Sequence, residues 1–219
     1  MIKGAIFDVD GTLLDSMPIW MEAGAKYLCT KSREPQDGLA EKIFTMTLEE
    51  SATYLKKEYQ LSDSVKDIMM EINHVIEQFY FDQVQLKEGA LEFLSDMYCA
   101  GVAMTIATAT DIYLVEQALE RLKIRHFFNQ IFTCTEVGAG KDKPWIYLAA
   151  RNSMKTRTEE TWVFEDALHA LVTAKNAGFP TVAIYDAASE KNQIILEEQA
   201  DLYWKQWKSY DCLCREMKQ

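Results

Sequence analysis

Short apolar runs alternate with amphipathic segments along most of this chain, and the two patterns predict different elements. The apolar runs are bounded by turn or polar residues, as buried strands are. They are Ile2–Phe7, Val102–Ala107, Gln130–Cys134, Thr161–Phe164 and Thr181–Tyr185. Apolar residues recur at helical spacing in the segments between them. These are Ala90–Cys99, Ile112–Leu122, Pro144–Met154, Leu168–Ala177 and Asn192–Gln199. The alternation predicts a parallel sheet with helices on both faces.

The pattern changes between about Ile19 and Phe81, where apolar residues recur at helical spacing and no convincing strand appears. Pro18 suits the first turn of a helix, and Thr47 and Glu50 have the spacing of a capping box. We therefore predict an α/β core with a doubly wound, Rossmann-like parallel sheet, formed by residues 1–16 and 86–219. Residues 17–85 form an inserted all-helical domain in this prediction.

Composition and charge restrict the partners of the chain. Its 219 residues are 48% hydrophobic, and 23 Lys and Arg against 34 Asp and Glu give a net charge of −11. Nucleic-acid binding requires clustered basic residues, so this balance argues against it. No apolar stretch is long enough to cross a membrane. An anionic substrate would need local positive charge at its site, from a metal or a few lysines.

The cysteines and the N-terminus favour a cytoplasmic protein. Five cysteines are an odd number without zinc-ligand spacing, which fits reduced thiols. The N-terminus becomes charged before a signal-peptide apolar stretch can develop. We expect a monomer or a weak dimer.

Polar residues follow three of the predicted strands. Asp8 and Asp10 come after the first, Thr108 ends the second, and Glu165 and Asp166 follow Thr161–Phe164. Ligands of a doubly wound sheet bind outside the carboxyl ends of its strands. Each group alone also has an ordinary reading, as an acidic turn, a strand-end hydroxyl or a helix cap. Their convergence at one edge predicts a site.

The chemistry of these residue types suits phosphoryl transfer. Asp8 and Asp10 are two positions apart, so both can point the same way from an extended segment. Close carboxylates repel, which favours a shared proton or a bound cation. With Asp166 they offer only oxygen ligands, which suits Mg²⁺. An aspartate can attack phosphorus, and a second carboxyl can act as general acid and base. A threonine and a lysine, Lys141 or Lys143, would hold the phosphate oxygens.

The segment Phe7–Ser16 reads Phe-Asp-Val-Asp-Gly-Thr-Leu-Leu-Asp-Ser and closely resembles the first motif of the haloacid dehalogenase superfamily, in its phosphatase and phosphomutase branch. Three segments that resemble its later motifs follow in the family's order: Thr105–Thr108, Gly140–Lys141 and Phe164–Asp166. The resemblance covers about Met1–Ser16 and Leu86–Ile184. The helical insert matches the family's cap in position and kind.

This resemblance implies roles for the strand-end residues. Asp8 is implied as the nucleophile and a magnesium ligand. Asp10 is implied as the general acid and base, with its backbone carbonyl on the metal. Asp166 is implied as the third protein ligand, with Glu165 beside it or one contact further from the metal. The true dehalogenases attack carbon and lack the second aspartate, so Asp10 favours phosphorus chemistry.

The same resemblance implies a phosphate site made by Thr108, Ala109 and Lys141. The family often reads Gly-Lys-Pro-x-Pro-Asp where this chain has Gly-Lys-Asp-Lys-Pro-Trp. Alignment on Pro144 selects Lys141, and Lys143 stays open as the alternative.

The expected function is hydrolysis of the phosphomonoester of a small phosphorylated metabolite, with Mg²⁺ and an aspartyl-phosphate intermediate. The helical insert would gate water and select the leaving group. A phosphomutase of the β-phosphoglucomutase type is the alternative, since it shares these motifs. A phospholigand-binding module without turnover is a third possibility, against which the intact set of site residues argues.

Overall fold

The computed structural model describes residues 2–44 and 46–217. The chain divides into two compact units. One unit is formed by Met1–Asp15 together with Gln85–Gln219, and the other by Ser16–Val84. The first unit is therefore assembled from two separate pieces of the chain.

The first unit contains a six-stranded sheet in which every neighbouring pair of strands is parallel, in the order β3-β2-β1-β4-β5-β6. The strands are β1 Gly4–Phe7, β2 Ala103–Thr108, β3 Gln130–Thr133, β4 Thr161–Glu165, β5 Thr181–Ile184 and β6 Leu202–Trp204. The prediction of a doubly wound parallel sheet is confirmed.

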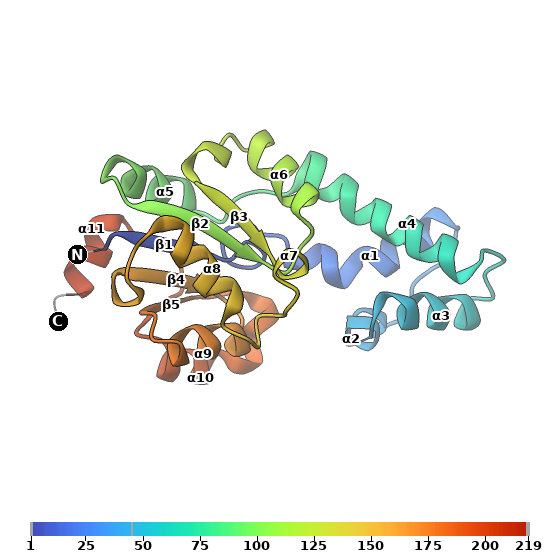
Figure 1. Cartoon of the computed structure of the whole chain (residues 1–219). Helices are drawn as coiled ribbons and strands as arrows, with labels where there is room; N and C mark the ends of the chain where they lie inside the picture. The colour runs from blue at the N-terminus through green and yellow to red at the C-terminus, as the bar shows by residue number, and fades with distance from the viewer. Residues whose placement is uncertain (1, 45, 218–219) are drawn as a thin grey trace. The chain divides into compact units, whose positions relative to one another are not determined.

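Helices connect these strands and cover both faces of the sheet. They are α5 Ala90–Cys99, α6 Ile112–Arg121, α7 Cys134–Val137, α8 Trp145–Met154, α9 Leu168–Asn176, α10 Gln193–Gln199 and α11 Tyr210–Glu216. Three 3₁₀ turns complete the unit: η2 Arg125–Phe127, η3 Thr158–Glu160 and η4 Ala187–Asn192. In Figure 1, α5 and α6 lie on one side of the sheet and α8, α9 and α10 on the other.

The central strands β1 and β4 are buried on both faces. Ile6 and Val163 belong to a cluster with residues of α8 and α9. The next residues along each strand, Phe7 and Phe164, stack on each other with ring centroids 4.7 Å apart, and both pack against Phe93 of α5. Successive side chains of a strand point to opposite faces. Both strands are therefore anchored on two sides up to the residues at which they end.

The second unit contains helices and no strand among its described residues. Its elements are α1 Met17–Thr30, α2 Leu39–Phe44, α3 Leu48–Glu58, α4 Val65–Gln78 and the π-helical turn η1 Phe79–Gln83. The predicted capping box at Thr47 and Glu50 is confirmed at the start of α3. A second box, formed by Ser64 and Asp67, begins α4.

The helical unit has its own small core. Leu55 of α3 and Ile68 of α4 are fully buried, as are Tyr27 of α1 and Tyr80 of η1. Trp20 donates a hydrogen bond from Nε1 to the hydroxyl of Tyr80, over 3.1 Å. Side chains of this unit therefore meet one another across its helices.

Several elements differ from the sequence prediction. The strand expected over Gln130–Cys134 ends at Thr133, because Thr133 and Glu136 form a capping box that begins α7. The pattern missed β6 and α11. The three residues of β6 are too few to show a period, and two of them are only half-buried.

Among the described residues, no helix is both long enough and apolar enough to cross a membrane. The five cysteines are free thiols.

Candidate active site

The strand order places a reversal point between β1 and β4. From β1 the sheet extends through β2 and β3 on one side and through β4, β5 and β6 on the other. Ligands of such sheets bind at this reversal, outside the carboxyl ends of the strands. Asp8 directly follows β1, Glu165 is the last residue of β4, and Asp166 follows it. The predicted acidic residues thus stand at the position that the topology favours.

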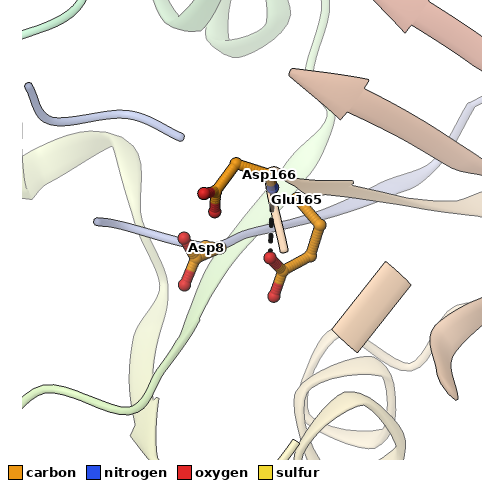
Figure 2. Close-up of side chains that lie close together, drawn as sticks. All are labelled: Asp8, Glu165 and Asp166. Atoms are coloured by element: carbon orange, nitrogen blue, oxygen red, sulfur yellow. Dashed lines mark hydrogen bonds between the residues drawn. The ribbon is translucent and has the colours of Figure 1, made fainter. Parts of the chain in front are cut away.

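Three buried carboxylates meet at this point. Asp8, Glu165 and Asp166 each offer an oxygen, and these oxygens lie within 4.8 Å of one another. The residues are 6%, 1% and 4% exposed. Figure 2 shows the three side chains gathered in the same small region, with the amide of Asp166 donating to Oε2 of Glu165 over 3.2 Å. Asp10 is not part of this carboxylate cluster.

Burial and mutual repulsion make the charged forms of the cluster unfavourable. The pKa of Glu165 is raised to about 7 by burial and then by Asp8, against the opposing effect of Lys141. Burial raises the pKa of Asp166 well above its ordinary value, and the negative charges of Asp8 and Glu165 raise it further. The cluster is therefore short of positive charge.

Lys141 is the cation inside the cluster. It is buried, and its ammonium contacts Oδ1 of Asp8 and lies 2.5 Å from Oε1 of Glu165. Burial lowers the pKa of Lys141, but Asp8 and Glu165 outweigh it, so the pKa stays well above the ordinary value. Tyr147 of α8 donates its hydroxyl to the same Glu165 oxygen over 3.0 Å. The side chain of Lys143 is 59% exposed and lies 3.7 Å from Asp142. The structure thus brings Lys141 to the carboxylates and leaves Lys143 at the surface.

Asp10 lies in a tight turn that follows β1. Gly11 has a φ of 81°, in the left-handed region that favours glycine. The amides of Leu13 and Leu14 donate back to the carbonyl of Val9, over 3.0 and 2.8 Å. Thr110, which follows β2, donates its hydroxyl to Oδ2 of Asp10 over 2.6 Å. The turn thereby presents the Asp10 side chain towards the end of β2.

Both carboxylate oxygens of Asp166 accept hydrogen bonds. The hydroxyl of Thr12 donates to Oδ1 and that of Ser189 to Oδ2, each over 3.3 Å. Thr12 is fully buried and comes from the turn after β1, whereas Ser189 lies in η4. Asp166 is thus oriented by two segments that lie far from it in the sequence.

Thr108 is the last residue of β2 and is fully buried. Its hydroxyl oxygen accepts a hydrogen bond from the amide of Thr110 over 3.1 Å. A hydroxyl that accepts one hydrogen bond can still donate another. Ala109, the next residue, is exposed. Since β2 pairs with β1, these two predicted phosphate-site residues lie at the same sheet edge as Asp8.

A family model described as haloacid dehalogenase-like hydrolase matches residues 5–184. The chain belongs to this family. The match spans β1 to β5 and includes every residue that the sequence predicted for the site. The hydrolase family suggested by the motifs is therefore confirmed.

Similar proteins agree with membership of the haloacid dehalogenase-like hydrolases. The chain is 23% identical over 181 residues to a phosphorylated carbohydrates phosphatase of Thermotoga maritima, covering 83% of this chain and 84% of that protein.

Two solved structures share the fold. One, from Thermotoga maritima and described as a candidate β-phosphoglucomutase, has a TM-score of 0.84 at 22% identity, over 93% of this chain and 94% of that one. The other is the magnesium-bound candidate hydrolase YfnB of Bacillus subtilis, with a TM-score of 0.77 at 18% identity, over 100% and 99% of the two chains.

The donor set of this haloacid dehalogenase-like hydrolase fits a hard divalent cation. Three buried carboxylates face a single buried lysine in the cluster, so negative charge exceeds positive charge there. Oxygen ligands are those that Mg²⁺ prefers. A divalent cation would supply the charge that the cluster lacks.

Sequence reasoning missed four side chains that contact the predicted residues: Thr12, Thr110, Tyr147 and Ser189. Two of them had a local signal. Thr12 lies inside the first motif, and Thr110 follows Thr108 by two residues. The other two had no local signal. Tyr147 looks like an ordinary apolar position of α8, and Ser189 lies beyond the region matched by the family model.

Proposed function

We propose that this protein is a Mg²⁺-dependent phosphomonoester hydrolase that acts on a small phosphorylated metabolite through an aspartyl-phosphate on Asp8. The observation that carries the proposal is the contact of Asp8 with Lys141 beside Glu165 and Asp166, at the reversal point of the sheet. The phosphatase name of the Thermotoga maritima relative supports it.

In this proposal, an oxygen of Asp8 attacks phosphorus and the bond from phosphorus to the leaving oxygen breaks. Asp10 donates a proton to that leaving oxygen. The oxygen of water then attacks the phosphorus of the aspartyl-phosphate and Asp10 accepts its proton. The bond from phosphorus to the Asp8 oxygen breaks, which releases inorganic phosphate and restores the Asp8 carboxylate. The hydrogen bond from Thr110 to Oδ2 of Asp10 fixes the carboxyl for both transfers.

Thr108, Ala109 and Lys141 would hold the phosphate oxygens. Lys141 has a second task, since its ammonium orients Asp8 through Oδ1. Glu165 and Tyr147 hold Lys141 in place, because Glu165 accepts from both of them through Oε1. We therefore assign Glu165 to the support of the lysine.

Asp8, Asp166 and the backbone carbonyl of Asp10 would hold Mg²⁺. When bound, the ion neutralises the carboxylates and lets a phosphate dianion approach an anionic nucleophile. Thr12 and Ser189 orient Asp166 for this role through its two oxygens.

The helical unit would select the substrate, and the free thiols favour a cytoplasmic location. Whether the protein is a monomer or a weak dimer stays a prediction. A phosphomutase is the second candidate, because a structure described as a candidate β-phosphoglucomutase shares the fold at a TM-score of 0.84. In a mutase, a sugar hydroxyl would replace water in the second step.

The test is a panel of phosphorylated metabolites, assayed for phosphate release with and without Mg²⁺. Asp8→Asn should lower turnover by several orders of magnitude, since uncatalysed monoester hydrolysis is extremely slow. Asp142→Asn is the matched control, because Asp142 lies beside Lys141 in sequence but is exposed. It should leave turnover unchanged.

Near-native turnover by Asp8→Asn, or full turnover without any divalent cation, would contradict the proposal. Phosphate release from several monoesters supports the hydrolase. Turnover that requires a sugar bisphosphate would favour the mutase instead.

A further inference from the structure

The C-terminal segment from residue 185 to residue 217 lies beyond the family match, yet one of its side chains reaches the turn after β1. Trp207 donates a hydrogen bond from its indole Nε1 to the carbonyl oxygen of Thr12, over 3.1 Å. The two residues are 195 positions apart, and Trp207 is only 8% exposed. This contact belongs entirely to the α/β unit.

The indole also packs on the residues that precede the site carboxylates. Its ring stacks on Phe164, with centroids 5.5 Å apart and planes at 29°. It lies 4.9 Å from Phe93 and 6.2 Å from Phe7. Phe7 directly precedes Asp8, and Phe164 directly precedes Glu165. One side chain therefore supports the ends of both strands that carry the carboxylates.

Thr12 connects this support to the site. Its hydroxyl donates to Asp166, and its carbonyl accepts from Trp207. A buried carbonyl that loses its hydrogen bond is unfavourable, so the surrounding backbone shifts to find another donor. Thr12 lies in the same turn as Asp10, four residues after Asp8. A shift of Thr12 therefore moves the carboxylates of Asp8 and Asp10, which precede it in the chain.

We propose that Trp207 is a positioning residue for the reaction, which acts by fixing the Asp8–Thr12 turn through the Thr12 carbonyl. This inference rests on the proposed function, because it takes Asp8 as the nucleophile. The indole touches no reacting atom, and its effect on the reaction passes through the backbone of the turn.

Trp204 provides a matched control. It is fully buried, packs against Phe93 and Phe164, and donates from its own Nε1 to Oε2 of Glu216 over 2.8 Å. The acceptor of its hydrogen bond lies within the C-terminal segment, whereas the acceptor for Trp207 lies in the Asp8–Thr12 turn. Both tryptophans are thus buried, pack against aromatic rings and donate a hydrogen bond from the indole N–H. They differ in the group that accepts this hydrogen bond.

The experiment compares Trp207→Phe with Trp204→Phe in the full chain with Mg²⁺, measuring kcat and KM for a phosphomonoester substrate and the melting temperature. Both variants lose some thermal stability, since each removes a buried hydrogen bond. Trp207→Phe lowers kcat about 10- to 100-fold while KM changes less than about threefold, because a misplacement of about 1 Å can slow a reaction about a hundredfold. Trp204→Phe keeps kcat within about twofold of the native value, because its hydrogen bond does not reach the turn.

A second substitution guards against poor folding of Trp207→Phe. A tryptophan analogue in which sulfur replaces the indole N–H is introduced at position 207 alone. It keeps the ring shape and removes only the donor, and the same loss of kcat is expected.

Native kcat in either change at position 207 would overturn the inference, as would an equal loss of kcat in Trp204→Phe. Asp8→Asn separates the two proposals. If that variant remains active, the proposed function fails. If it is inactive while both changes at position 207 are native, only the role of Trp207 fails.

Discussion

The two units differ in where they place their charged groups. The α/β unit buries Asp8, Lys141, Glu165 and Asp166 together at one edge of its sheet. In the helical unit, the charged residues of the capping boxes are exposed, as Glu50 is in the Thr47 box. Buried charges oppose folding unless they are compensated, whereas exposed caps stabilise a helix at little expense. Buried clusters of charged groups with shifted pKa values are typical of functional sites.

Because of this difference, we expect substitutions in the two units to affect different properties of the protein, namely turnover and stability. Substitutions in the buried cluster of the α/β unit should act first on chemistry. Substitutions in the helical unit should act first on folding. The predictions below test this separation, beginning with the largest expected effect.

Lys141→Met should lower kcat/KM about 10²- to 10³-fold, the usual loss when one charge-stabilising donor is removed from a site. Lys143→Met is the matched control, two residues away, with a side chain that is 59% exposed. It should be native in steady-state assays of phosphate release. Equal losses in both variants would show that the phosphate lysine was wrongly chosen.

Ile68→Ala should lower the free energy of unfolding by about 2–5 kcal/mol, since it opens a cavity in the core of the helical unit. Met70→Ala removes a side chain from the same helix that is 53% exposed, and should cost little. Urea unfolding followed by circular dichroism measures both. The separation of roles breaks down if Met70→Ala is the more damaging of the two.

The smallest effects compare two capping boxes. Thr47→Ala and Thr133→Ala each remove the N-cap hydroxyl of a helix, and each should lower stability by about 1 kcal/mol. Only Thr133→Ala should also slow turnover, because α7 leads directly into the segment that carries Lys141. Thermal melts and initial rates of the two variants, measured side by side, check this. A slower Thr47→Ala with native Thr133→Ala would reverse the expected order.

The sequence was sufficient for β1 to β5 and for the acidic residues at their ends, but not for the three-residue β6. Parallel strands buried on both faces are short apolar runs, and β1, β2, β4 and β5 all have this form. The ends of such strands meet at one edge, so the sequence alone predicts that Asp8 and Asp166 lie close together.

The remaining contacts depend on distant parts of the chain. Lys141 and Lys143 lie two residues apart, and only the alignment on Pro144 favours Lys141 in the sequence. In the fold, the amide of Lys143 donates to the carbonyl of Gly140, and the two lysines have different surroundings. Trp207 and Thr12 are 195 positions apart. No periodicity or short motif links residues at such separations, because their proximity arises from the assembled sheet.

The discontinuous α/β unit has a consequence for folding on the ribosome. Strand β1, which Asp8 follows, is made before the strands that flank it, since these begin at Ala103 and Thr161. The helical unit is complete at Val84, so its residues emerge together and can fold early. The first strand must wait for its partners, and Trp207 emerges later still. The nascent chain therefore carries Asp8 without the flanking strands and without Trp207 until those later segments have been made.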